Sequence, residues 1–107
     1  MEKKQREELY ERAIKDWGPD AQVKMMFEEM GELSVAIARF DRGRASIKDV
    51  ITEIADVIIM AEQMGLIFGK EKTENEIEYK LNRLKEKLDK FEKEHGTEGK
   101  EKGVVCL

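Results

Sequence analysis

The sequence has 107 residues, of which 41% are charged and 40% are hydrophobic, and its formal net charge is −4. This length suits one domain, and the balance of charged and apolar residues is typical of a helix-rich soluble protein and not of a disordered one. Both signs of charge are interspersed, so we expect no nucleic-acid partner. A chain this short leaves long helices partly uncovered, which favours a homo-oligomer.

Cysteine usage and the absence of targeting signals favour the cytoplasm. Cys106 is the only cysteine, so no disulfide can form within the chain. The stretch MEKKQREELYER is too polar for a signal peptide, and no apolar run is long enough to span a membrane. We therefore expect a cytoplasmic protein without a membrane partner.

The spacing of apolar residues predicts an all-α fold with four helices, at about 2–16, 21–40, 46–64 and 74–94. Gly18 and Pro19 separate the first two helices, and Asp20 is a plausible N-cap of the second. A polar turn, Asp41 to Arg44, leads to the third helix, and GLIFGKEK reads as the connector to the fourth. The predicted architecture is a four-helix bundle.

Capping signals support the last two helices. Ser46 with Asp49 resembles a capping box, and Thr73 with Glu76 gives a second one. Gly96 is a plausible C-cap. We therefore predict a single helical domain over residues 1–95 and a flexible C-terminal tail over residues 96–107.

Acidic residues lie unexpectedly close to apolar helix faces. At about 100° per residue, Glu29 falls inside the apolar face of the second helix, Glu32 at its edge and Glu28 further round. The third helix is apolar nearly all round, which is typical of a buried helix, yet it carries Glu53 and Asp56. A short turn joins the two helices, so antiparallel packing can bring these acids together.

Such a cluster is electrostatically costly, at roughly 3 kcal/mol for each pair of charges 5 Å apart in a medium of dielectric constant 20. Protonation of some acids, pairing with Lys or Arg, or a divalent cation can offset this cost. Oxygen ligands without His or Cys favour Mg²⁺ or Mn²⁺ over zinc. The alternative is that these acids form ordinary solvated helix faces with ion pairs along each helix.

The paired acidic motifs resemble those of a known family. EEMGE (28–32) followed by EIAD (53–56) resembles the EExxE…ExxD signature of the MazG-like all-α nucleoside triphosphate pyrophosphohydrolases. ELSVAI and IADVIIMAEQM are also similar to that family, and the resemblance extends from about residue 17 to residue 84. Dimeric dUTPases, dCTP pyrophosphatases and phosphoribosyl-ATP pyrophosphohydrolases share variants of the motif, so the preferred nucleotide stays open.

The resemblance implies an enzyme that cleaves (d)NTPs between the α- and β-phosphates in nucleotide-pool housecleaning. It implies that Glu28 orients or deprotonates the attacking water, or helps to hold an additional metal ion. Mg²⁺, with Mn²⁺ as a substitute, would be coordinated by Glu29, Glu32, Glu53 and Asp56.

Further roles follow from the resemblance more loosely. Lys80, Asn82 and Arg83 on the last helix would bind the substrate phosphates, although a solvated helix face is the alternative. Trp17 and Gln22 are candidates for a base pocket; the alternatives are a core position for Trp17 and a surface position for Gln22. Gly31 removes a side chain where a ligand approaches, or is simply a tolerated helix glycine.

Arg42 and Arg44 flank the polar turn, and we interpret them as solvated.

The second functional hypothesis is a non-catalytic nucleotide- or metal-binding module used for regulation or oligomerisation. A di-iron bundle is excluded because it needs Glu-x-x-His ligands and the lone His95 is not placed to supply one. For either hypothesis we expect a homodimer or a tetramer made of two dimers.

Overall fold

The computed structural model describes residues 1–96, and all regular structure within that range is helical. Four helices follow one another: α1 (Lys3–Trp17), α2 (Pro19–Asp41), α3 (Ile47–Phe68) and α4 (Lys70–His95). The all-α prediction is therefore confirmed. The predicted tail lies outside the described residues, except for Gly96. Its positive φ of 73° and its N–H bond to the Glu92 carbonyl fit the expected C-cap.

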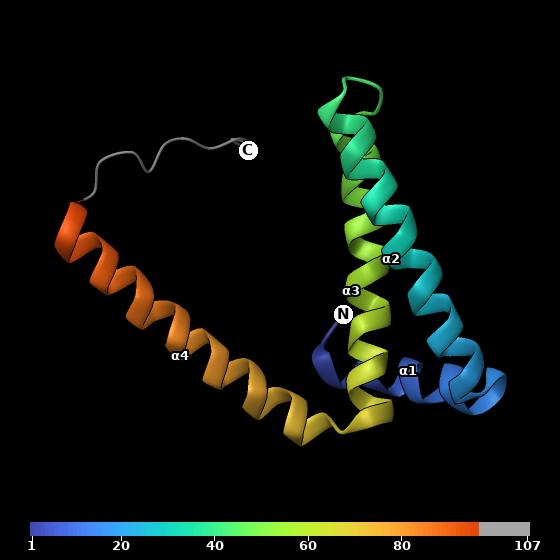
Figure 1. The fold of residues 1–107 in the computed structure, drawn as a ribbon. Coiled ribbons are helices and arrows are strands. Elements are labelled where there is room, and N and C mark those ends of the chain that lie inside the picture. The colour runs from blue at the N-terminus through green and yellow to red at the C-terminus, as the bar shows by residue number, and fades with distance from the viewer. Residues whose placement is uncertain (97–107) are drawn as a thin grey trace. The chain divides into compact units, whose positions relative to one another are not determined.

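The chain divides into two units, residues 1–70 and residues 71–107. In the first unit, α2 and α3 pack side by side in opposite directions, and α1 contacts both of them (Figure 1). This confirms the predicted antiparallel pairing of the two acid-bearing helices. In the second unit, the described residues of α4 form one amphipathic helix with exposed apolar residues.

Glycine and proline set the boundary between α1 and α2. Gly18 has a φ of 92°, which side-chain-bearing residues rarely adopt, and it ends α1 and precedes α2. Pro19 occupies the first helical position, where its missing N–H costs no hydrogen bond. The expected N-cap role of Asp20 is therefore wrong, because Asp20 already lies inside the first turn.

Polar contacts of α1 hold it against α3. The Arg6 Nη2 and Glu62 Oε1 atoms are 2.6 Å apart, and the Tyr10 hydroxyl donates to the same carboxylate. Lys70 Nζ lies 2.9 Å from Glu7 Oε1. Tyr10 is only 7% exposed, so its ring supplies part of the small core of this unit. Exposed ion pairs stabilise little on their own, and the buried ring gives these contacts a fixed geometry.

The predicted connector between the last two helices is largely helical. α3 continues to Phe68, and Gly69, with a φ of 140°, is the only residue between α3 and α4. Thr73 and Glu76 consequently lie inside α4 and cap nothing. The prediction failed because GLIF and KEKTENE are both compatible with a helix, and a capping motif acts only where a helix begins.

Candidate metal centre

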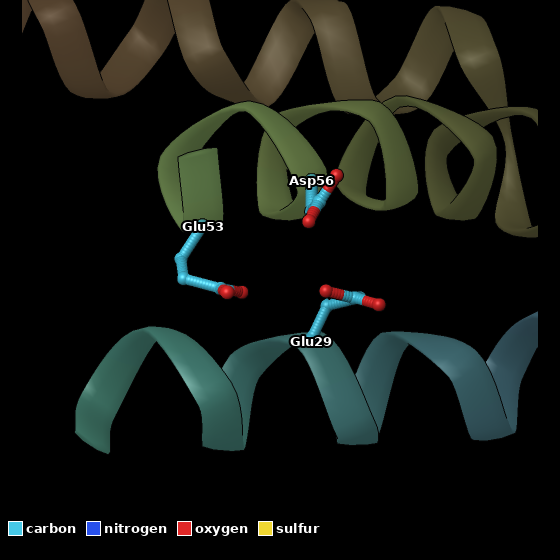
Figure 2. Close-up of side chains that lie close together, drawn as sticks. All are labelled: Glu29, Glu53 and Asp56. Atoms are coloured by element: carbon cyan, nitrogen blue, oxygen red, sulfur yellow. The ribbon is translucent and has the colours of Figure 1, made fainter. Parts of the chain in front are cut away.

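Three carboxylates meet between α2 and α3. One carboxylate oxygen each of Glu29, Glu53 and Asp56 lies within 4.8 Å of the other two. Figure 2 shows Glu29 extending from α2 towards α3, and Glu53 and Asp56 extending from α3 towards α2. The expected meeting of acids across the helix pair is thus observed for these three residues, while metal binding by them stays a prediction.

The local sequence explains why these side chains converge. Glu53 and Asp56 are three residues apart, so they lie on the same face of α3. The Ser46 hydroxyl accepts a bond from the Asp49 N–H at 3.1 Å, and the Asp49 carboxylate accepts one from the Ser46 N–H at 2.9 Å. This predicted capping box is confirmed, and it fixes the start of α3 about two and a half turns before Asp56.

All three carboxylates are partly buried, and two of them hold oxygens without a partner. Within residues 1–96, Glu29 Oε2 and Glu53 Oε2 are buried and accept no hydrogen bond. Leaving such an acceptor unsatisfied costs about 1–3 kcal/mol, and more for a charged group. No Lys or Arg of residues 1–96 pairs with these acids. Of the three ways to offset their repulsion, protonation and a cation remain.

Burial and repulsion act on these acids in the same direction. The pKa of Glu29 is raised, first by burial and then by the charges of Glu32, Asp56 and Glu53. The pKa of Glu53 is raised by burial, then by Glu32 and Asp56. Without a cation the cluster therefore favours binding protons, whereas a divalent cation would favour the ionised carboxylates.

The chemistry of the donors fits a hard divalent cation. The cluster offers carboxylate oxygens alone, and neither His nor Cys belongs to it. Such a donor set suits Mg²⁺ or Mn²⁺ and not zinc. Because two of the oxygens are buried and unpartnered, the residues present fit the cation that the sequence predicts.

Glu32 and Glu28 lie outside this three-residue group. Glu32 is exposed, yet its charge contributes to the raised pKa values of both Glu29 and Glu53. Glu28 is also exposed. Both side chains, together with Glu53, line a groove of about 770 Å³ along α2, the turn and α3. The groove therefore places the acid expected to act on water beside two of the expected metal ligands.

Gly31 lines the same groove. Among residues 1–96, a Cβ atom at this position would meet no atom within 4 Å apart from its chain neighbours and the local helix backbone, and the φ of Gly31 is not positive. Neither turn geometry nor close packing in this chain therefore requires a glycine here. A role in ligand approach remains a prediction, to which this open space adds support.

The structure contradicts the alternatives given for the two candidate base-pocket residues, while the base pocket itself stays a prediction. Trp17 is 71% exposed, so it is no core residue in this chain, and Gln22 is only 3% exposed, so it is no surface residue. Neither lines the groove. The sequence alternative placed Gln22 on the surface. Gln22 is instead buried because it lies near the start of α2, and α1 contacts α2.

The candidate phosphate-binding residues Lys80, Asn82 and Arg83 all lie on α4 in the second unit, and all are exposed. The Lys80 Nζ atom is 3.8 Å from Glu76 Oε2, and the Arg83 guanidinium lies 6.0 Å from the centre of the Tyr79 ring. Their role towards phosphate stays a prediction.

Sequence reasoning missed several residues that line the groove, among them Phe27, Arg39 and Arg44. Arg39 follows Glu32 by seven residues, or about two helical turns, so its position on the acidic side of α2 was available from spacing. Arg44, interpreted as a solvated turn residue, is brought to the groove only by the path of the turn.

Comparisons of the chain with protein-family models, curated proteins and solved structures return no match. The resemblance to the MazG-like family is therefore a prediction from the acidic motifs alone.

Proposed function

We propose that this protein is a Mg²⁺-dependent nucleoside triphosphate pyrophosphohydrolase that releases pyrophosphate and a nucleoside monophosphate, in nucleotide-pool housecleaning. The observation that carries the proposal is the convergence of Glu29, Glu53 and Asp56, two of them with buried, unpartnered oxygens. The resemblance of EEMGE and EIAD to the family signature supports the reaction type.

In this proposal, Glu29, Glu53 and Asp56 hold the cation, and Glu32 adds a fourth carboxylate from the edge of the groove. A bound Mg²⁺ neutralises phosphate charge and lowers the pKa of coordinated water. Glu28 is exposed on the groove, so its carboxylate can accept a proton from the attacking water or orient that water. Mn²⁺ offers the same oxygen-ligand chemistry as a substitute.

The proposed active form is a homodimer or a tetramer made of two dimers. Within the first unit, the surface of α3 that was predicted to be buried is partly exposed: Ile51, Ile54 and Ile58 are 54%, 39% and 47% exposed. Exposed apolar side chains in such number support the proposal that a second subunit covers this surface. No helix within residues 1–96 is both long and apolar enough to cross a lipid bilayer.

A panel of standard and damaged nucleotides, incubated with Mg²⁺ and assayed for pyrophosphate and orthophosphate, tests the function. We expect pyrophosphate from at least one (d)NTP. Glu29→Gln and Asp56→Asn should each lower the rate by about 100-fold or more, since changes in groups that only support metal ligands already cost 10–100-fold. Circular dichroism should show unchanged helix content.

Absence of pyrophosphate release from the whole panel would contradict the proposed reaction. Isothermal titration then distinguishes the alternative, because metal-dependent nucleotide binding without turnover is the property expected of the non-catalytic module.

A further inference from the structure

Arg39 and Arg44 lie together at the turn end of the groove. The Arg44 N–H donates to the Arg39 carbonyl at 2.7 Å, and Gly43, with a φ of 73°, lets the chain turn back after α2. Both arginines line the groove that Glu32 and Glu53 also line. The turn thus adds two positive charges to one end of an otherwise acidic groove.

The guanidinium groups of this pair are not engaged elsewhere. Among residues 1–96, neither side chain makes a hydrogen bond or an ion pair. Asp49 lines the same groove, and its pKa is lowered first by its bonds to Ser46 and then by the charge of Arg39; its carboxylate is already bonded to the Ser46 N–H. Two guanidinium groups without a bonded partner are available to bind an anion that enters the groove.

We propose that Arg39 and Arg44 bind the end of the substrate's polyphosphate chain. This inference rests on the proposed function. It adds a second contact with the substrate, which the proposed function does not require. The planar guanidinium group matches phosphate oxygens with two parallel hydrogen bonds. Because an anion cannot approach Glu32 and Glu53 without a cation, the arginines supply a second attraction for phosphate, from the turn end of the groove.

The proposal predicts selection by the number of phosphates. A triphosphate can contact the acidic cluster through Mg²⁺ and reach the arginine pair, whereas a monophosphate has one phosphate to share between the two. We therefore expect the arginine pair to distinguish triphosphate from monophosphate, independently of the nucleobase.

Arg42 provides a matched control. It lies in the same turn, is exposed and carries the same charge, but it does not line the groove. Its backbone N–H bonds to the end of α2, and a change of side chain leaves that contact in place. Arg42→Gln therefore removes one positive charge from the turn without removing one from the groove.

The test measures binding of inorganic tripolyphosphate in the presence of Mg²⁺ by isothermal titration. The variants are Arg39→Gln, Arg44→Gln, the double variant and Arg42→Gln. We expect each groove variant to bind about tenfold more weakly, since the charged hydrogen bonds from the guanidinium group to phosphate are lost. Arg42→Gln should stay within about twofold of the wild type, as expected of a solvated charge. Mn²⁺ binding and thermal unfolding, measured for every variant, report whether the acidic cluster and the fold persist.

Equal binding by the double variant and the wild type, no binding by the wild type, or equal loss in Arg42→Gln would overturn the inference. The outcome is separable from that of the nucleotide panel. Arginine-dependent tripolyphosphate binding without pyrophosphate release would contradict the enzyme and support the arginine pair. Pyrophosphate release with an unchanged KM in the double variant would support the enzyme and contradict phosphate binding by the arginine pair.

Discussion

Glu29 is a partly buried carboxylate that has other acids as its neighbours. Its position inside an apolar helix face desolvates the carboxylate, and Glu32, Asp56 and Glu53 add repulsion to that burial. Desolvation and repulsion both disfavour the ionised carboxylate, so helix stability alone does not explain a glutamate at this position. The same desolvation strengthens binding of a cation, since fewer waters screen the attraction.

Gly31 gives a prediction at the level of a single residue. Gly31→Ala should stabilise the fold by about 1 kcal/mol, since alanine has the higher helix propensity and the new Cβ meets no protein atom. For a domain of this size, that corresponds to a rise of ~4–8 °C in the unfolding temperature. The same substitution should lower the rate of pyrophosphate release, because the methyl group enters the groove. Calorimetry and the pyrophosphate assay measure the two effects.

Gly43→Ala is the matched control for that change. A Cβ at Gly43 also meets open space, but the φ of 73° disfavours any side chain. This variant should therefore lower the unfolding temperature, in contrast to Gly31→Ala. A lower unfolding temperature in Gly31→Ala would show that the helix requires glycine at that position for a structural reason.

The α2–α3 pair is the element that builds the site, and its precision depends on where α3 begins. Glu53 and Asp56 lie in the second and third turns of α3, and the Ser46–Asp49 capping box fixes the first turn. Backbone N–H bonds at a helix start hold the register of the side chains that follow. The capping box consequently positions two of the three converging carboxylates.

Ser46→Ala is therefore expected to destabilise the protein by about 1 kcal/mol, the usual cost of losing an N-cap side chain. Urea unfolding followed by circular dichroism measures this effect. Ser34→Ala serves as the control because Ser34 is exposed within α2 and its side chain makes no bond among residues 1–96. Equal stability of Ser46→Ala and wild type would show that the cap contributes nothing to the start of α3.

For the protein as a whole, the acidic cluster predicts a pH-dependent stability that Mg²⁺ reverses. The raised pKa values of Glu29 and Glu53 mean that the metal-free folded state favours their protonated forms. Their stabilising contribution is present below the ordinary glutamate pKa and is lost as pH rises through the raised values. Mg²⁺ requires the ionised forms, so its stabilising effect should grow with pH.

Thermal unfolding from acidic to neutral pH, in EDTA or in Mg²⁺, measures both trends. Glu29→Gln cannot ionise, so in EDTA it should become more stable than the wild type as pH rises, and Mg²⁺ should stabilise it less. Glu28→Gln, at an exposed position, is the control. A difference between wild type and Glu29→Gln that does not change with pH would contradict the raised pKa.

Assembly is the other prediction for the whole molecule. Light scattering at micromolar concentration should give the mass of a dimer or tetramer, because the exposed isoleucines of α3 otherwise face water. Ile58→Lys should shift the protein towards the monomer, since a charge buried in an interface costs several kcal/mol. A wild-type monomer under these conditions would contradict the prediction.

The sequence by itself determined the helical content, the antiparallel α2–α3 pairing, the Ser46 cap and three of the four acids expected to converge, Glu32 being the exception. These features depend on local periodicity and on one short turn, which leaves few alternatives. Only the tertiary structure decided that Gln22 is buried and Trp17 exposed, that α3 extends to Phe68, and that Arg39 and Arg44 line the groove. Those outcomes depend on contacts between helices and on the path of the turn, which no pattern within a single helix specifies.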